Sequence, residues 1–327
     1  MSKKTYTIRE PVDDREWDQL VQVSPQGTLF SLSAYLQASR IPYRRVLICK
    51  GEEIRAGASF STGEDGQSCG RAGGIYNGLL HVEYEKVRPT KQQQEQFQIA
   101  EFFVEWLTAR YNPIELILSP HFPDLRPFLW HNYHSADPSD HFTVDLRYTS
   151  YLDISSLQQC SDEMESALFQ NIETTRRQQV RKARKACSVT RIGGDEREFV
   201  QLYRALMERQ GVAFGSDEVE RMSAHIQGMV GAGIAQLFFT HDAAGELIYA
   251  TLFGWDGKRA YYLFGVPGYG KGASYQGTIA CWDAFVWLAS QGIAEVDMEG
   301  VNSPSRGWFK LSFGGKLLPY HWIRKSA

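Results

Sequence analysis

The spacing of hydrophobic and polar positions switches repeatedly between a helical period and a strand period. Apolar residues three or four positions apart predict amphipathic helices at residues 14–23, 28–39, 91–110, 161–187, 196–210, 217–229 and 278–290. Alternating or short continuous apolar runs between turn residues predict strands at residues 5–9, 45–49, 54–61, 114–119, 236–240, 247–254, 259–266 and 293–298. Helices that alternate with strands are typical of an α/β protein.

One order of elements occurs twice along the chain. The hairpin at residues 46–60 and the helix–strand pair at 99–115 match the hairpin at 237–253 and the helix–strand pair at 279–295. Chance similarity between ordinary α/β segments is the alternative. Because the helix and strand lengths also agree, we expect a duplicated mixed α/β unit. A chain of 327 residues suits two such domains, 1–150 and 151–327.

Composition narrows the setting but not the activity. A hydrophobic content of 43% is ordinary for a globular protein, and a net charge of −3 gives no general attraction to nucleic acid or membranes. No run of ~18 apolar residues predicts a membrane span, and the N-terminus has no apolar signal segment. The five cysteines are scattered, so we expect a reduced, cytoplasmic protein with no metal site.

The stretch from residue 297 to 315 is the strongest candidate for a site. Asp297 and Glu299 stand at the end of a predicted strand, and a loop rich in Gly, Ser, Asn and Pro follows. Lys310 then lies between Phe309 and Phe313. Acids at a strand end, a flexible loop and a lysine between aromatic residues are typical of a binding cleft in an α/β protein. A surface loop with a solvated lysine is the alternative.

The order D-x-x-G, loop, F-K-x-x-F-G-G in this stretch resembles the FemAB family. That family comprises the peptidoglycan-bridge aminoacyltransferases and their acyltransferase relatives with a GNAT-like fold. The usual D-x-G-G appears here as residues 297–300, and Leu311-Ser312 replaces a basic-Gly pair, which leaves the substrate open. The resemblance implies two tandem GNAT-like domains with mixed sheets, the last segment packing back on the first.

The resemblance also implies roles for single residues. The matching lysine of the family acts in substrate binding and catalysis, so we expect that role for Lys310, next to Phe309. Asp297 and Glu299 are the candidates for the base that an amine acceptor needs. Three further residues stand near positions that contact the acceptor in relatives: Tyr262, Arg209 and Arg40. Core packing is the alternative for Tyr262, and a surface charge for Arg209.

Two stretches could bind phosphate. Arg177, Arg181 and Arg184 share one face of the predicted helix 161–187 and could bind tRNA, coenzyme A, a nucleotide-sugar or a lipid-linked pyrophosphate. A solvated basic face is the alternative. The glycine-rich loop before the helix at 278 resembles the GNAT pyrophosphate loop, without its leading Gln or Arg. Its donor-binding candidates are Gly270, Gly272 and Ala273; a plain turn is the alternative.

These observations predict an acyl- or aminoacyltransferase that works through a ternary complex. The donor would be an acyl-CoA or an aminoacyl-tRNA, and tRNA would be a partner only in the second case. The acceptor would be an amine of a sugar or of a small or lipid-linked cell-envelope precursor. The rival hypothesis is a non-catalytic protein of the same fold that binds a phosphorylated glycan or a nucleic acid.

Overall fold

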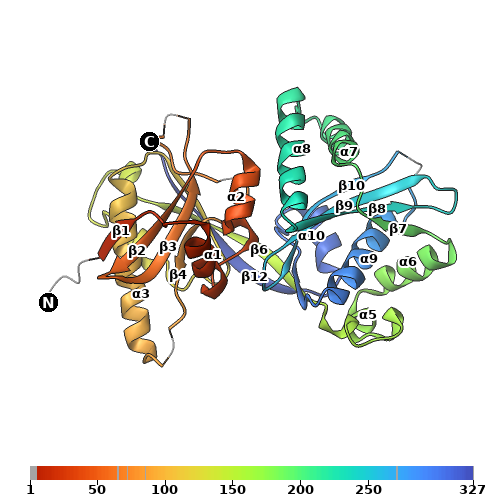
Figure 1. Cartoon of the computed structure of the whole chain (residues 1–327), viewed down its shortest axis with the longest axis horizontal. Helices are drawn as coiled ribbons and strands as arrows, with labels where there is room; N and C mark the ends of the chain where they lie inside the picture. The colour runs from red at the N-terminus through yellow and green to blue at the C-terminus, as the bar shows by residue number, and fades with distance from the viewer. Residues whose placement is uncertain (1–5, 65, 72, 85, 270–271, 327) are drawn as a thin grey trace. The chain divides into compact units, whose positions relative to one another are not determined.

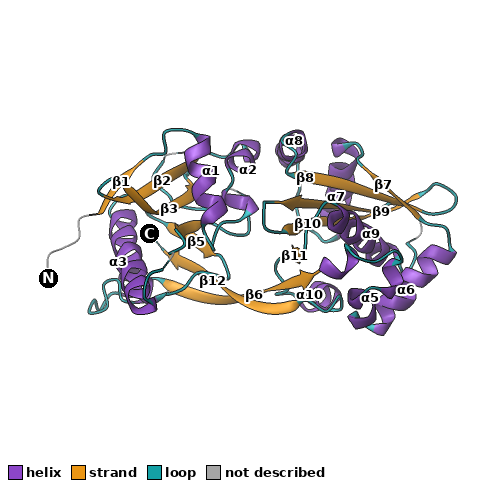
Figure 2. Ribbon diagram, turned by 60° about the horizontal axis from the view of Figure 1, so that its bottom comes forward, coloured by secondary structure: helices purple, strands orange, loops and turns teal. Residues whose placement is uncertain are grey.

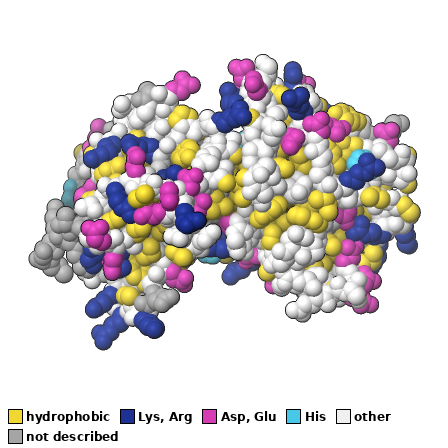
Figure 3. Space-filling view, viewed as in Figure 1, with side chains coloured by type: hydrophobic (Ala, Val, Ile, Leu, Met, Phe, Trp, Pro, Cys, Tyr) yellow, Lys and Arg dark blue, Asp and Glu magenta, His cyan; other side chains and the backbone are white. Residues whose placement is uncertain are grey.

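The computed structural model describes residues 6–326 except 65, 72, 85, 270 and 271. It divides the chain into two compact units, Met1–Arg147 with Pro319–Ala327, and Tyr148–Leu318. Figure 1 follows the chain through its elements by colour. On the face shown in Figure 3, acidic and basic side chains are interspersed. This face therefore presents no broad patch of a single charge.

The first unit is built on a four-stranded antiparallel sheet in the order β1-β2-β3-β4. Alternate residues of β2 face opposite layers: Val46 and Ile48 share a core with Phe103 of α3, while Leu47 shares one with Trp17 of α1. The elements are β1 (Tyr6–Arg9), α1 (Asp14–Val23), α2 (Ser33–Ser39), β2 (Tyr43–Lys50), β3 (Glu53–Ser61), β4 (Gly78–His81), α3 (Pro89–Thr108), β5 (Ile114–Leu118) and α4 (Arg126–Leu129). The last strand, β12 (Lys316–Lys325), pairs with β5 from His321 onward.

The second unit contains the sheet order β6-β11-β10-β9-β8-β7. Helix α9 packs against β8, β9 and β10 (Figure 2). Its Phe285 shares a core with Phe238 and Phe253. The elements are β6 (Thr143–Asp153), α5 (Ala167–Asn171), α6 (Thr174–Lys185), β7 (Val189–Ile192), α7 (Glu196–Arg209), α8 (Ser216–Gly231), β8 (Ala235–His241), β9 (Leu247–Trp255), β10 (Ala260–Pro267), α9 (Gln276–Ser290), β11 (Glu295–Asp297) and α10 (Pro304–Leu311).

The repeated order predicted from the sequence is present in both units. A β2–β3 hairpin, β4, α3 and β5 follow one another in the first, and a β8–β9 hairpin, β10, α9 and β11 follow one another in the second. The expected fold class, two tandem GNAT-like α/β domains, is confirmed. No helix in the described part of the chain is long and apolar enough to cross a membrane.

The bounds predicted for several helices were wrong, and some strands were not predicted. The long helix expected at residues 161–187 is broken, because Ile172 is extended at the end of α5 and α6 begins anew at Thr174. The backbone N–H of Glu173, in the break, donates to the carbonyl of Ser312 at 3.0 Å. The helix expected at 28–39 is likewise interrupted at Leu32. Strands β4, β6, β7 and β12 were not expected.

The loop expected after residue 300 contains a helix, α10. Ser303 is its N-cap and Pro304 occupies its first turn, a pairing that favours a helix start. Gly307 lets the helix approach the preceding loop, since a Cβ there would lie 2.5 Å from the carbonyl oxygen of Val301. The helix carries Lys310 in its last turn.

Candidate functional site

A cleft opens in the second unit where two neighbouring parallel strands diverge. β10 pairs with β11 only at Ala260 and Tyr261, and a bulge at Leu263 then shifts the register of β10 against β9. The bulge leaves the backbone of Leu263 outside both ladders. Past this point lies a cavity of about 610 Å³ with walls from α7, β9, β10, the start of α9 and α10. The carboxyl ends of parallel strands are the usual position of an α/β binding site.

Five of the residues predicted from the sequence line this cleft: Tyr262, Ala273, Glu299, Phe309 and Lys310. They come from β10, the loop before α9, the segment after β11, and α10. All five follow β9 along the chain. The cleft is therefore assembled by the last third of the chain together with α7.

Asp297 lies beneath the cleft and Glu299 lines it. Asp297 is fully buried at the end of β11, where its carboxylate accepts the hydroxyl of Thr149 and, at 2.7 Å, the backbone N–H of Glu299. Glu299 has a left-handed backbone (φ +57°), which is costly for a residue with a Cβ. The strand alternation that would put both acids on one face therefore ends at Asp297. Asp297 can position Glu299, while Glu299 is the acid that reaches the cavity.

Lys310 lines the same cavity as Glu299 and is largely buried with it. Its ammonium donates to the carbonyl of Gly300 at 3.2 Å and lies 5.4 Å from the ring centroid of Tyr262. Burial lowers the pKa of Lys310, and the carboxylates of Glu299 and Asp297 oppose that shift. Burial raises the pKa of Glu299 to about 8, against the attraction of Lys310. An acid and an amine with their pKa values pushed toward neutrality are suited to proton transfer.

The start of α9 forms another wall of the cleft. Ser274, Gln276 and Gly277 line it, so the N-terminal backbone amides of a 15-residue helix are near the cavity. The Oε1 atom of Gln276 is buried without a hydrogen-bond partner, which leaves a polar group for a ligand to satisfy. Ala273 lines the cleft and Gly272 is exposed beside it, whereas the predicted Gly270 lies outside the described residues.

This wall fits the donor groups expected from the sequence. The Gln276 amide can bond to the amide or ester of an acyl donor, and the helix start favours an anion. A methyl group at Gly265 would lie 2.0 Å from the Tyr262 hydroxyl, so only glycine leaves this part of β10 open. Among the described residues there is no group of three or more His, Cys, Asp or Glu side chains that could hold a metal ion.

The three predicted arginines of α6 have different surroundings. Arg184 is held between Glu163, at 2.7 Å, and Asp283, at 2.6 Å, so its charge is already neutralised. Arg181 is exposed and lies 5.2 Å from the ring centroid of Phe169. Arg177 donates to the hydroxyl of Thr174 at 3.0 Å. None of the three is among the residues that line the cleft.

The two other predicted arginines also lie away from the cleft lining. Arg209 is exposed on α7, where its Nε donates to the carbonyl of Ala205 at 3.2 Å. Its neighbour Gln210 lines the cavity instead. Arg40 belongs to the first unit, where it caps α2 in a left-handed conformation. Their proposed contacts with an acceptor stay predictions.

Sequence reasoning passed over several lining residues, among them Tyr203, Tyr249, Gln276 and Arg306. Tyr203 of α7 and its C-cap residue Gln210 are seven positions apart, so helical spacing predicts that they lie on the same side of the helix. Tyr249 and Gln276 carried no local signal. Their side chains meet Tyr262 and Gly272 only because β9, β10 and α9 pack together.

Comparison with known proteins shows the fold. No family model and no curated protein sequence matches the chain. Among solved structures, a crystal structure of FemX is similar over 97% of this chain and 96% of its own, with TM-score 0.64 and 12% identity. A structure of L-PGS from Bacillus licheniformis is similar over 97% of this chain and 93% of its own, with TM-score 0.52 and 10% identity.

A third similar structure is a tandem GNAT protein from the clavulanic acid biosynthesis pathway. It covers 98% of this chain and 97% of its own, with TM-score 0.51 and 11% identity. At these identities the likeness extends to the path of the backbone and not to the substrates. The chain has the fold of two tandem GNAT-like domains that FemX and the tandem GNAT protein also have.

Proposed function

We propose that the protein transfers an acyl or aminoacyl group to an amine in the cleft between β10 and α10. The observation that carries the proposal is that Glu299, with a raised pKa, and Lys310, with a lowered one, line one cavity of about 610 Å³ and attract each other electrostatically. The tandem GNAT-like fold, together with the resemblance of residues 297–315 to FemAB proteins, supports acyl transfer over other chemistries.

In this proposal Glu299 takes the proton of the attacking amine. The amine nitrogen then bonds to the acyl carbon, the bond from that carbon to the sulfur of a thioester or the ribose oxygen of an ester breaks, and the leaving sulfur or oxygen takes up the proton that Glu299 holds. The Lys310 ammonium stabilises the negative charge that builds on the acyl oxygen. Asp297 is a positioning residue, since it holds the backbone of Glu299 without reaching the cavity. Phe309 and Tyr262 form the walls beside the reacting atoms.

The donor is an acyl-CoA or an aminoacyl-tRNA, and the acceptor is an amine of a sugar or of a cell-envelope precursor. The donor supplies the activated acyl group, as a thioester or an ester. Within the cleft, the chain's own contribution is to orient the acceptor, exclude water and move one proton at Glu299.

The test is transfer of radiolabelled acyl groups from a panel of acyl-CoAs and aminoacyl-tRNAs to amino sugars and envelope precursors. Glu299→Gln and Lys310→Met should each reduce turnover by about 10²–10³-fold, as expected for a proton acceptor and for an oxyanion partner. Glu208→Gln, an exposed change on α7, is the matched control and should retain full turnover.

Undiminished turnover in both cleft variants would refute this site. Donor binding with no turnover for any acceptor in the panel would instead favour the non-catalytic protein of the same fold.

A further inference from the structure

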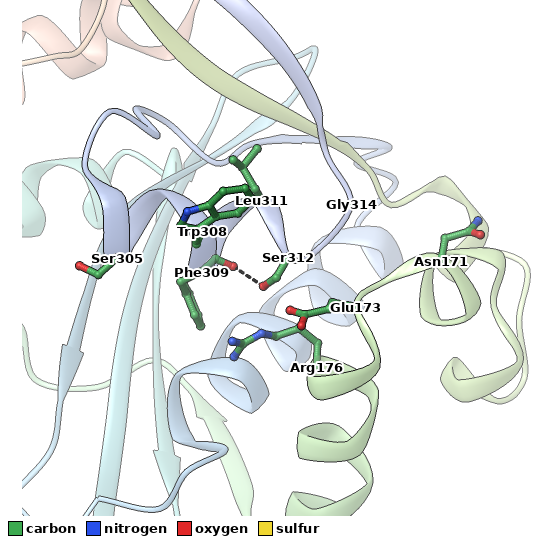
Figure 4. A pocket seen from close by; sticks show the side chains of 9 residues that line it. All are labelled: Asn171, Glu173, Arg176, Ser305, Trp308, Phe309, Leu311, Ser312 and Gly314. Atoms are coloured by element: carbon green, nitrogen blue, oxygen red, sulfur yellow. Dashed lines mark hydrogen bonds between the residues drawn. The ribbon is translucent and has the colours of Figure 1, made fainter.

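A second cavity adjoins the cleft on the other side of Phe309. It has a volume of about 680 Å³ and lies between α10 and the break that separates α5 from α6. Ser305 and Phe309 line both the cavity and the cleft. We call this cavity the α10 groove; its other walls include Glu173, Arg176 and Trp308 (Figure 4).

Arg176 brings a half-buried positive charge into the α10 groove. Its Nη1 donates to two neutral oxygens, Thr278 Oγ1 at 2.6 Å and Gln179 Oε1 at 2.7 Å. Its Nε is buried and has no hydrogen-bond partner. Within the described residues no ion pair joins Arg176 to a carboxylate, in contrast with Arg184, which has two. A partly desolvated guanidinium without an ion pair gains from a charge-assisted bond to an anion, so the groove can accept one.

Aromatic faces lie beside this charge. The Arg176 guanidinium carbon lies 5.0 Å from the ring centroid of Phe309, and Figure 4 shows the two groups facing each other. Trp308, the preceding residue of α10, is 73% exposed, so its indole is available to another planar group. Exposed aromatic rings beside arginine are the means by which proteins bind unpaired bases without reading their sequence.

Glu173 adds a carboxylate to the guanidinium and the aromatic rings of the α10 groove. Glu173 is exposed at the start of α6 and accepts the hydroxyl of Thr175 at 3.2 Å. Its remaining lone pairs can accept from sugar hydroxyls, a role that acidic residues have beside bound ribose in dinucleotide sites. Its charge also partly offsets that of Arg176, which disfavours a simple multivalent anion relative to a ligand that has both phosphate and hydroxyl groups.

We propose that the α10 groove binds a nucleoside phosphate, with the phosphate on Arg176, the base against Trp308 and the ribose hydroxyls at Glu173. The proposal rests on the proposed function, because the reacting end of the same donor would then lie past Phe309 in the cleft. Acyl-CoA and aminoacyl-tRNA both carry a nucleoside phosphate, so the chemistry is shared by the two donors. The arginine that binds the donor is thus Arg176, rather than the three arginines predicted from the sequence.

The first experiment measures binding without turnover. Calorimetric titrations of the full chain with adenosine 5′-monophosphate and with inorganic pyrophosphate are compared for wild type, Arg176→Gln, Trp308→Ala and the exposed control Lys185→Gln. Arg176→Gln should weaken both ligands by about tenfold or more, as expected for a charge-assisted phosphate contact. Trp308→Ala should weaken only the nucleotide, by about tenfold, as expected for the loss of one base stack.

Three results would overturn the assignment. The first is no nucleotide binding by wild type. The second is equal affinity in wild type and Arg176→Gln. The third is a loss of pyrophosphate binding in Trp308→Ala as large as the loss of nucleotide binding, which would mean that the change disturbs α10 as a whole. A purely structural role for Arg176 is tested separately: in that case Arg176→Gln would unfold at a much lower temperature than wild type without ligand, whereas a binding role predicts similar melting temperatures.

Competition experiments then show whether the nucleotide in the groove belongs to an acyl-CoA or to an aminoacyl-tRNA. Coenzyme A and a short RNA hairpin with a single-stranded 3′ end are each titrated against bound adenosine 5′-monophosphate. Displacement by coenzyme A alone identifies an acyl-CoA donor, and displacement by RNA alone identifies a tRNA donor. Displacement by neither would refute the link between the groove and a donor. Nucleotide binding that depends on Arg176 without any acyl transfer would refute the proposed function, and transfer without such binding would refute only the groove.

Discussion

The buried carboxylate of Asp297 accepts the backbone N–H of Glu299 at 2.7 Å and so holds Glu299 in a left-handed conformation at the mouth of the cleft. Asp297 also accepts the hydroxyl of Thr149 on β6, which ties the end of β11 to its neighbouring strand. One buried acid thereby sets the direction of a second acid that lines the cavity. The first two predictions concern this pair.

Asp297→Asn should lower both stability and activity. The Thr149 hydroxyl and the Glu299 N–H both donate to the same oxygen, Oδ1, so the carboxamide can keep both bonds but loses the charge that strengthens them, at a cost of about 1 kcal/mol in the free energy of unfolding. The negative charge of Asp297 also raises the pKa of Glu299. Removing that charge should therefore move the acidic limb of the pH–rate profile to lower pH. Urea unfolding and a pH–rate profile measure the two effects, with the exposed Asp153→Asn as control.

If Asp297→Asn keeps the wild-type profile while losing stability, Asp297 acts on the fold alone and does not position Glu299.

The pH dependence of wild type should reflect the raised pKa of Glu299. As a base, Glu299 acts in its ionised form, so turnover should rise with pH through about 8. The stability that Glu299 contributes should change with pH in the opposite direction to turnover. The folded state favours the neutral carboxyl, so the stability that Glu299 contributes is full below the ordinary pKa of 4.5 and is lost as pH rises through about 8.

Melting temperatures of wild type and Glu299→Gln across that pH window test the second statement. The difference between them should move in favour of the variant as pH rises. A constant difference would mean that Glu299 titrates like an exposed glutamate.

Gly307→Ala should disturb α10 and with it Lys310. The added Cβ would lie 2.5 Å from the carbonyl oxygen of Val301, so the helix or the loop has to shift. We expect a loss of about 1–3 kcal/mol in the free energy of unfolding, the usual cost of overpacking, together with reduced turnover. Gly231→Ala is the control, because a Cβ at that position at the end of α8 has nothing within 4 Å. Unchanged stability and turnover in Gly307→Ala would contradict the packing described for α10.

Arg184→Met should lower the stability of the protein and leave its ligand binding unchanged. Its guanidinium lies between Glu163 and Asp283, and the side chains of both acids are largely buried. Removing it leaves two neighbouring carboxylates without their cation, at a cost of about 1–3 kcal/mol, reduced from the fully buried case by partial exposure. Chemical unfolding should show this loss, and Lys185→Gln, exposed in the same helical turn, should not. A stable Arg184→Met protein that fails to bind donor would restore Arg184 as a phosphate ligand.

Most helices and strands could be predicted from the sequence because their signals are local. Trp17, Leu20 and Val21 mark one face of α1, and the expected bounds of that helix are the observed ones. The predictions failed where local signals conflicted or were short. The helical spacing of residues 161–187 concealed the extended residue Ile172, whereas the start of α10 at Ser303-Pro304 had a signal that was assigned to a loop.

In the candidate site, too, some features follow from local sequence and others from tertiary packing. The sequence by itself determined a repeated α/β unit and a C-terminal segment that carries the candidate site residues Asp297, Glu299, Phe309 and Lys310. Only the tertiary structure decided that Asp297 is buried beneath Glu299, that Arg184 is neutralised and that Arg176 is the arginine beside Phe309. The reason is physical: helical and strand periods depend on residues a few positions apart, while burial, charge pairing and pKa shifts depend on groups that long-range packing brings together.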